Sequence, residues 1–312
     1  MRNFYDKTTT HPCYSSKAQH KYARIHLPVA PACNISCNYC SREYDCVNES
    51  RPGVTSELLA PEDALDRYQI ARKKLNNLTV VGIAGPGDAL ANWENTRRTL
   101  ELIYGYEQDE ISAVDKNSNS NPALMSNALN FCLSTNGLLL PELAKEIVAL
   151  NVRHVTVTVN SLDPVIGALI YHSVNYRGKT YYGTEGAELL IRNQLEGIKQ
   201  LVEYGVLVKI NIVMIEGIND DHVPEVVKKM KELGVFTTNI MPFIPVKGSP
   251  FENRTATDTK SILKMRLQCG KFMRQMSHCK QCRADAVGML GKDCSGELFR
   301  RKNKCRIQTE AG

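Results

Sequence analysis

The sequence predicts an α/β fold, a partial barrel of about six strand–helix units with an extension at each end. Short apolar runs rich in β-branched residues alternate along the chain with stretches of helical length, and this order is typical of a parallel sheet covered by helices. Six units fall short of the eight that close a full barrel, so the predicted barrel is open. The 312 residues are enough for one such domain.

Each predicted strand is a short apolar run that ends at a turn or a polar residue. The strands are expected at 22–30, 78–85, 129–137, 153–160, 206–214 and 235–243. The helices are expected near 61–75, 93–106, 141–150, 185–204, 220–234 and 258–276, with Pro141 opening one first turn and Gly234 closing another helix.

The remaining segments define the domain organisation. Residues 1–20 lack periodicity and are predicted to be an extended, flexible arm. The polar stretch 107–127 is predicted to be a flexible insertion in a barrel domain that spans 21–245. Residues 246–312 form a cysteine-bearing C-terminal extension and not a second domain.

Composition and charge argue against a nucleic-acid-binding, secreted or membrane protein. The net charge is +6, but the basic runs are scattered and lack interleaved aromatic residues, so we expect no nucleic-acid partner. The first residues lack the apolar core of a signal peptide, and no apolar run reaches the ~18 residues of a membrane helix. We therefore expect a cytoplasmic protein with no membrane partner. Its eleven cysteines then indicate metal binding or catalysis more than disulfides.

The stretch "CNISCNYC" brings three cysteines together with the spacing C-x3-C-x2-C. These are Cys33, Cys37 and Cys40, directly after the first predicted strand. A structural zinc site or a ferredoxin-type cluster uses four protein ligands. Three thiolates would hold three irons of a four-iron cluster and leave the fourth iron open to a substrate or cofactor. A zinc site, or a purely redox cluster with Cys46 as fourth ligand, remains the alternative.

A triplet of this spacing, placed after the first strand of a partial barrel, resembles the radical S-adenosylmethionine (SAM) superfamily. The resemblance implies a [4Fe-4S] cluster whose open iron chelates SAM and whose electron cleaves it to a 5′-deoxyadenosyl radical. Tyr39 matches the aromatic residue beside the last cysteine, and "GPGD" lies where the family has its glycine-rich turn, with Gly85 as the expected backbone contact. The other expected SAM contacts are placed at strand ends: Thr135, Thr158, Lys209 and Met241.

Longer motifs resemble the NifB family of nitrogenase cofactor biosynthesis proteins over nearly the whole chain. They are 26–54 ("HLPVAPACNISCNYCSREYDCVNESRPGV"), 82–92, 131–141 and 279–291. The resemblance implies an enzyme that fuses two [4Fe-4S] clusters around a carbide derived from the SAM methyl group, with an extra sulfur. No carrier domain follows residue 312, so we expect the stand-alone form of the family.

The NifB resemblance also implies two substrate-cluster sites beyond the SAM cluster. His26, Cys46 and Cys132 match the ligands of one site, and Cys13, Cys279 and Cys282 match the other. On this reading Cys13, carried by the flexible arm, folds over its cluster after loading.

Some residues in or near these motifs have more than one possible role. The alternative for "CKQC" is half of a zinc site, for which His278 or Cys294 could serve as further ligands. Glu43 and Glu49 flank Cys46 and are candidates for proton handling during carbide formation, or are solvated loop carboxylates. The cysteines left over are predicted to be reduced, unpaired thiols: Cys269, Cys294 and Cys305.

The resemblance implies three kinds of protein partner: an iron–sulfur cluster donor, a ferredoxin-like electron donor, and a cofactor carrier or scaffold. Two alternatives to the main hypothesis stay open. One is another radical SAM enzyme whose extra clusters relay electrons, and the other is a non-catalytic iron–sulfur carrier.

Overall fold

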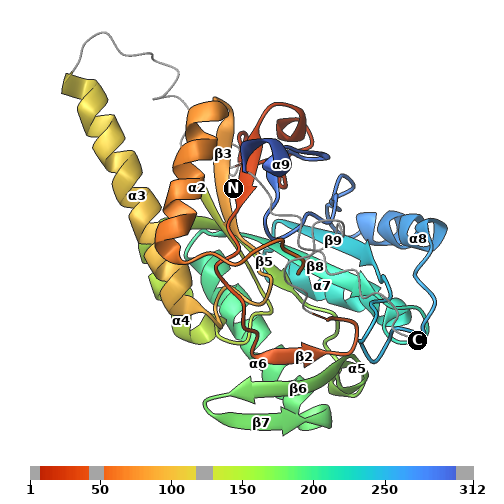
Figure 1. Ribbon diagram of the computed structural model, residues 1–312. Helices are drawn as coiled ribbons and strands as arrows, with labels where there is room; N and C mark the ends of the chain where they lie inside the picture. The colour runs from red at the N-terminus through yellow and green to blue at the C-terminus, as the bar shows by residue number, and fades with distance from the viewer. Residues whose placement is uncertain (1–7, 42–52, 117–128, 300–312) are drawn as a thin grey trace, which may run out of the picture.

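The computed structural model describes residues 8–41, 53–116 and 129–299. Its centre is a sheet in the order β11-β10-β1-β3-β4-β5-β8-β9 (Figure 1). The six strands from β1 to β9 in this order are all parallel, which confirms the predicted partial barrel. They are β1 (Ala23–His26), β3 (Leu78–Ile83), β4 (Asn130–Thr135), β5 (Val152–Thr158), β8 (Leu207–Met214) and β9 (Thr237–Pro242).

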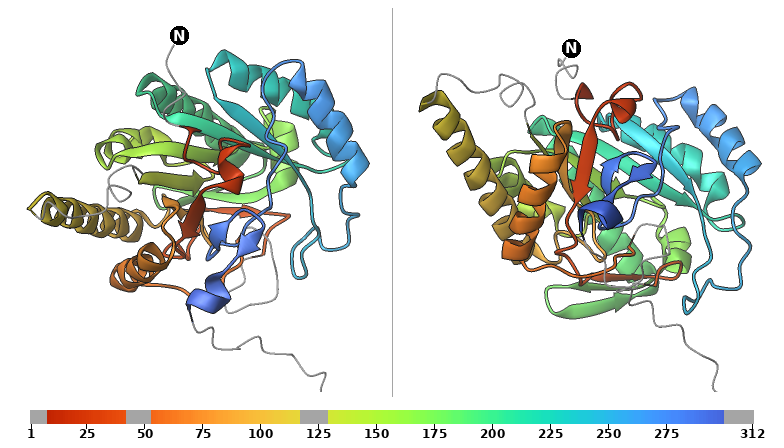
Figure 2. Two further views of the ribbon diagram at one scale, coloured as in Figure 1. Left: turned by 90° about the horizontal axis from the view of Figure 1, so that it is seen from above. Right: turned by 45° about the horizontal axis from the view of Figure 1, so that its top comes forward.

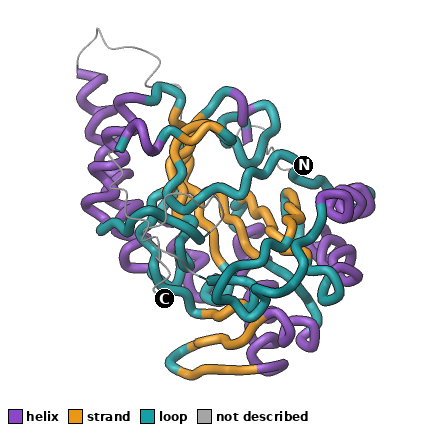
Figure 3. The backbone as a smooth tube through the Cα atoms, turned by 45° about the vertical axis from the view of Figure 1, so that its right-hand side comes forward, coloured by secondary structure: helices purple, strands orange, loops and turns teal. Residues whose placement is uncertain are grey.

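Helices follow the strands and lie at the periphery of the molecule, with the strands between them (Figure 3). They are α2 (Pro61–Lys74), α3 (Trp93–Lys116), α4 (Leu140–Ala149), α6 (Gly183–Glu203), α7 (Val223–Glu232) after the 3-10 turn η3 (Asp220–His222), and α8 (Thr259–Gly270). Helix α8 therefore ends six residues before the predicted 276.

Helix α3 corrects the prediction of a flexible insertion, because residues 107–116 continue the helix. The carboxylate of Glu107 accepts hydrogen bonds from Tyr68 (2.6 Å) and Arg72 (3.3 Å) of α2, which anchors this polar turn to its neighbour. Residues 117–127 of the predicted insertion lie outside the described residues.

The apolar core lies between the outward face of the sheet and the helices. Alternate strand residues such as Val81, Leu133 and Ile210 are fully buried and pack in one cluster with Ile103 and Ile147 of the helices. The opposite face of the same strands is more polar, because successive side chains of a strand point to opposite sides. That inward face lines the cavity described below.

A second, three-stranded sheet was not predicted. It consists of β2 (Ile35–Cys37), β6 (Tyr171–Tyr176) and β7 (Lys179–Tyr182), preceded by α5 (Pro164–Ile170). The hairpin β6–β7 turns at Arg177 and Gly178, whose φ angles of 50° and 76° are those of a type I′ turn. Strand β2 lies inside the cysteine triplet, so this sheet fixes the cysteine loop.

The N-terminal residues correct the prediction of an extended, flexible arm. Residues 8–20 form turns and the 3-10 helix η1 (Ala18–His20), and they lie across the end of the barrel where the strands begin (Figure 2). Tyr14 is 1% exposed, and its hydroxyl donates to the carbonyl oxygens of Val155 (3.2 Å) and Leu207 (3.3 Å). The segment therefore closes the amino end of the barrel.

The C-terminal extension adds β10 (Val287–Met289), β11 (Lys292–Asp293) and α9 (Ser295–Leu298). Strand β10 pairs antiparallel with β1, so the extension continues the barrel sheet and covers its edge. Within the described part of the chain, none of the helices combines the length and apolarity that crossing a membrane requires.

Candidate functional site

A cavity of about 280 Å³ occupies the inside of the partial barrel. The inward residues of the strands line it, among them Cys132 of β4, Thr156 of β5, Lys209 of β8 and Asn239 of β9. All the sequence-predicted thiol ligands that the structure describes line this one cavity: Cys13, Cys33, Cys37, Cys40, Cys132, Cys279 and Cys282. None of the nine described cysteines forms a disulfide.

The cysteine triplet is held by the small sheet and by the end of β4. Cys37 pairs with Tyr171 of β6, and the Cys40 amide donates to the Cys37 carbonyl oxygen (3.1 Å), which curls the loop. Asn136 Nδ2 donates to Cys33 Sγ (3.7 Å) and to Asn34 Oδ1 (2.6 Å). The loop thus presents three thiols to one side of the cavity, a donor set that fits an iron–sulfur cluster.

The turn after β3 packs directly against the residues that precede the triplet. The Gly87 amide donates to the Ala30 carbonyl oxygen (2.7 Å), and a Cβ at Gly87 would lie 2.0 Å from the Ala32 carbonyl oxygen. Gly85 has φ +133°, a conformation that favours glycine, but it is not among the residues that line the cavity, whereas Pro86 and Gly87 are.

Asp88 of this turn joins three elements and was not identified from the sequence. Its buried carboxylate accepts from the Thr135 hydroxyl (3.0 Å), the Asn136 amide (2.6 Å) and the amides of Leu90 and Ala91. Burial raises the pKa of the Asp88 carboxyl, and these hydrogen bonds oppose the rise. Asp88 therefore fixes the ends of β3 and β4 around the cysteine loop.

Two of the residues predicted at strand ends are found there. Thr135 and Thr158 are the last residues of β4 and β5, and both line the cavity. Met241 packs in an apolar cluster that also contacts Tyr39 and two of the triplet cysteines, Cys33 and Cys37. The hydroxyl of Tyr39 accepts a hydrogen bond from Asn160 Nδ2 (3.0 Å).

Lys209 was placed at a strand end, and this placement is wrong. It is the third residue of β8, which continues for five more residues to Met214. The side chain is 7% exposed, and its ammonium lies 5.3 Å from the centre of the Tyr14 ring. Lys209 thus belongs to the inner end of the cavity, beside the segment that closes the barrel.

His26 is oriented as an imidazole that offers one nitrogen to the cavity. Its Nδ1 lies 2.9 Å from the Arg283 carbonyl oxygen, which only accepts, so Nδ1 carries the hydrogen and Nε2 carries the lone pair. Burial, with the nearby Arg24 charge, lowers the pKa of His26 to about 4, which keeps the ring neutral. A Cβ at Gly82 would lie 2.9 Å from His26 Cδ2, so this glycine makes room for the ring.

Cys132 lies beside the inner end of the same cavity. Burial raises the pKa of its thiol to about 12; Lys209 opposes the rise, and negative charge on Cys13 adds to it. Burial also raises the pKa of Cys13, while Lys209 and Arg24 lower it. The two thiols, assigned to different substrate-cluster sites, are therefore electrostatic neighbours.

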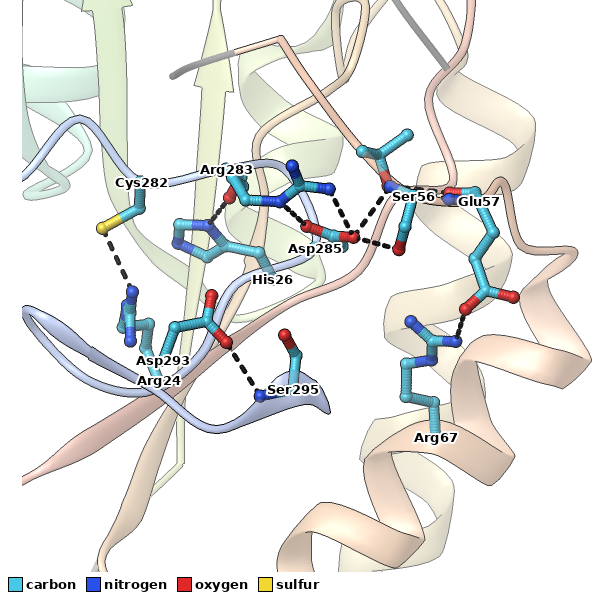
Figure 4. Close-up of polar contacts among 11 residues, drawn as sticks. Arg24, His26, Ser56, Glu57, Arg67, Cys282, Arg283, Asp285, Asp293 and Ser295 are labelled. Atoms are coloured by element: carbon cyan, nitrogen blue, oxygen red, sulfur yellow. Dashed lines mark hydrogen bonds and ion pairs between the residues drawn. The ribbon is translucent and has the colours of Figure 1, made fainter. Parts of the chain in front are cut away.

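The third predicted ligand set is assembled from the two ends of the chain. Cys13 lies in the N-terminal segment, which already sits in the cavity, so the expected folding over of a mobile arm is not needed to bring it there. Arg24 Nη2 donates to Cys282 Sγ (3.1 Å), as Figure 4 shows. Cys279 packs against the apolar cluster that also contacts Cys33 and Cys37.

The inner end of the cavity also carries His11, which was not identified from the sequence. His11 is 1% exposed, and its Nδ1 accepts from the Cys13 amide (3.2 Å), while its Nε2 has no hydrogen-bond partner among the residues that the structure describes. The ring packs against Tyr14 and His154, with centroid separations of 4.6 and 4.4 Å. Only the sequence proximity of His11 to Cys13 could have indicated its place.

Several predicted residues are not brought to this cavity or cannot be placed. Cys269 is on the buried face of α8, where burial raises its pKa to about 11, and Cys294 lies near the Val287 carbonyl oxygen; neither lines the cavity. His278 Nε2 contacts the Pro12 carbonyl oxygen (3.0 Å). Among the described side chains, no three His, Cys, Asp or Glu are grouped closely enough for a single metal ion. Outside the described residues lie Glu43, Cys46, Glu49 and Cys305.

A family model described as "Radical SAM superfamily" matches residues 27–230, and this chain belongs to that superfamily. The chain is also similar to the FeMo cofactor biosynthesis protein NifB of Klebsiella pneumoniae, with 48% identity over 94% of this chain and 59% of that protein. The NifB of Chlorobaculum tepidum is 42% identical over 93% of this chain and 64% of its own length. The resemblance to the NifB family is thus confirmed, and the chain spans roughly three fifths of these relatives.

Solved structures agree with the fold. SuiB of Streptococcus suis superposes with a TM-score of 0.55 at 14% identity, over 83% of this chain and 51% of that one. The structure of anSMEcpe with bound AdoMet gives a TM-score of 0.52 at 16% identity, over 80% and 59%. At these identities the likeness concerns the fold alone.

Proposed function

We propose that this protein is a NifB-type radical SAM enzyme. It fuses two [4Fe-4S] clusters, with insertion of a SAM-derived carbide and an extra sulfur, into the precursor of the nitrogenase cofactor. The observation that carries the proposal is the convergence of three thiol-bearing ligand sets on one cavity inside the barrel. A barrel with only the first set would suit ordinary radical chemistry on an organic substrate.

In this proposal Cys33, Cys37 and Cys40 would hold the resident cluster, and that cluster would supply the electron for cleavage of SAM. Tyr39, Thr135, Thr158 and Met241, with the turn that contains Gly85, would hold SAM at the strand ends. The chain's contribution there is positional, since Asp88 fixes the turn and the end of β4 against the cysteine loop.

The two substrate clusters take the deeper ligand sets. His26 Nε2 and Cys132 bind one of them, with Cys46 as the expected third ligand. Cys13, Cys279 and Cys282 bind the other. A neutral imidazole in the first set leaves less negative charge than a third thiolate and holds the cluster less tightly, which suits a cluster that is consumed.

The reaction as proposed is lyase-like and combines methyl transfer from SAM with radical carbide insertion. Glu43 and Glu49 remain candidates for accepting the protons that the methyl carbon loses. The protein would act in the cytoplasm, taking clusters from a donor protein and electrons from a ferredoxin-like protein. A carrier or scaffold protein would accept the product.

The nucleoside products test this function. The protein would be reconstituted anaerobically with iron(II) and sulfide, mixed with SAM and dithionite, and analysed by mass spectrometry. The proposal expects both S-adenosylhomocysteine and 5′-deoxyadenosine. Only 5′-deoxyadenosine would point to another radical SAM enzyme with auxiliary clusters, and neither product to a cluster carrier.

Cysteine variants locate each activity within the protein. Cys37→Ala should abolish both products, because it removes a ligand of the resident cluster. Cys279→Ala should lose S-adenosylhomocysteine and keep 5′-deoxyadenosine. Cys269→Ala is the matched control, since this buried thiol does not line the cavity, and it should keep both.

A further inference from the structure

Arg24 is a buried cation at the edge of the cavity. The residue is 2% exposed and lies on β1, with its side chain directed toward the C-terminal extension (Figure 4). Its Nη1 donates to the carbonyl oxygens of Gly288 and Met289, and its Nη2 donates to Cys282 Sγ at 3.1 Å. Among the described residues, its Nε has no hydrogen-bond partner.

No carboxylate among the described residues forms an ion pair with Arg24. The two acidic groups drawn nearby in Figure 4 are already engaged: Asp285 pairs with Arg283, and Asp293 accepts from the Ser295 amide (2.8 Å). A guanidinium taken out of water without a counter-ion is costly for the folded protein. An anion bound in the cavity would offset that cost.

A second buried cation faces the same space. Lys209 is 7% exposed, lines the cavity, and makes no ion pair with any carboxylate that the structure describes. The buried acid that lines the cavity, Asp88, lies at the other end and is bound by Thr135 and main-chain amides. The cavity is therefore lined by two cations, Arg24 and Lys209, neither of which is ion-paired with a described carboxylate.

We propose that Arg24 is a positioning residue for the substrate cluster bound by Cys13, Cys279 and Cys282. Its Nη2 holds the sulfur of Cys282, and its unpartnered Nε donates a further hydrogen bond to the anionic cluster. This inference rests on the proposed function, because it assigns a role toward one of the two substrate clusters.

The charge of Arg24 has a measurable consequence for that cluster. Reduction adds one negative charge to an iron–sulfur cluster, and hydrogen bonds to its sulfurs stabilise the reduced form. Arg24 therefore raises the reduction potential of this cluster. Removing the positive charge while keeping a donor, as in Arg24→Gln, should lower the potential.

The test is an EPR-monitored redox titration of the full-length protein after anaerobic reconstitution with iron(II) and sulfide. The signal of this cluster is identified as the one that Cys279→Ala removes. At a fixed potential, Arg24→Gln should lower the ratio of reduced to oxidised cluster about tenfold, which is about 59 mV for a one-electron couple. Arg24→Lys, which keeps the charge, should restore most of the difference.

Arg67→Gln is the matched control. Arg67 is also largely buried, pairs with Glu57 and stacks on the Phe299 ring of the extension at 4.4 Å, but it does not line the cavity. It should leave the potential unchanged. Equal shifts in Arg24→Gln and Arg67→Gln would overturn the inference, because they would indicate a general loosening of the extension.

The outcomes separate this inference from the proposed function. If wild-type protein has no signal that depends on Cys279, the assigned cluster site and the inference both fall. If that signal is present but keeps its potential in Arg24→Gln, the inference fails while the proposed function stands. Arg24→Lys provides the second measurement should the Gln variant fold poorly.

Discussion

Asp285 connects the C-terminal extension to the segment that follows the cysteine loop, and Asp285→Ala should break this connection. Its side chain is 1% exposed and pairs with Arg283 Nε at 2.8 Å. The same carboxylate accepts from the amide (2.9 Å) and the hydroxyl (2.6 Å) of Ser56. Arg283 in turn positions His26 through its carbonyl oxygen, so the pair supports a predicted cluster ligand.

The loss of stability expected for Asp285→Ala can be worked from the pKa of the Asp285 carboxyl. Burial alone would raise the pKa of Asp285, but hydrogen bonds from Arg283 and Ser56 outweigh it and lower the pKa from 3.8 to about 2. Lowering the pKa by this much corresponds to about 2 kcal/mol of stability at neutral pH. The Asp285→Ala change also leaves the Arg283 guanidinium buried without its partner. The free energy of unfolding should therefore fall by about 3 to 5 kcal/mol.

The stabilisation that Asp285 contributes depends on pH in a defined direction. Because the folded-state pKa lies below the unfolded value, the stabilisation is fully present above about pH 5 and is lost as the pH falls toward 2. Urea unfolding of the reduced, metal-free protein at several pH values measures it. The exposed Glu94→Gln is the control and should change stability by less than about 0.5 kcal/mol. A loss below about 1 kcal/mol for Asp285→Ala at pH 7, or a difference that does not shrink toward pH 2, would refute the reasoning.

Three further predictions concern the cavity and its closure. Gly82→Ala should displace His26, whose Cδ2 lies 2.9 Å from the added Cβ, and destabilise the fold by about 1 to 3 kcal/mol while lowering iron content after reconstitution. Cys132→Ala should lower the iron content by about four atoms per chain, whereas Cys269→Ala should not, as measured by iron analysis. Tyr14→Phe should cost about 1 kcal/mol in urea unfolding, because it removes a buried hydroxyl that donates to two strand carbonyls.

Each of these predictions has a contrary result. Unchanged iron content in Gly82→Ala would mean that the His26 ring is not required where the structure places it. Equal iron content in the Cys132→Ala and Cys269→Ala proteins would remove Cys132 from the ligand sets. A Tyr14→Phe protein as stable as wild type would mean that the N-terminal segment does not close the barrel through this hydroxyl.

The barrel was predictable because its strands are buried on both faces or nearly so, and each is a short apolar run. The hairpin Tyr171–Tyr182 was missed although Tyr171, Val174 and the Arg-Gly turn follow a hairpin pattern, since its second strand is largely exposed and polar. No periodicity in the sequence of residues 8–20 indicates that this segment closes the barrel. It depends on tertiary contacts of single side chains such as Tyr14.

The candidate site, like the fold, was predictable from the sequence only in part. The cysteine triplet is local, so its spacing alone predicts a shared loop. Cys13 and Cys282 are far apart in the sequence, and their placement in one cavity could be expected only through the family resemblance. Arg24 and Asp88 carry no motif of their own, because their roles follow from burial and partners that only the fold defines.

Iron-edge anomalous diffraction from anaerobically grown crystals of the reconstituted protein tests the central claim most directly. Three separate peaks are expected in one cavity: one at Cys33, Cys37 and Cys40, one at His26 and Cys132, and one at Cys13, Cys279 and Cys282. A single peak at the triplet, with the other thiols bearing no iron, would contradict the proposal that this cavity joins two substrate clusters.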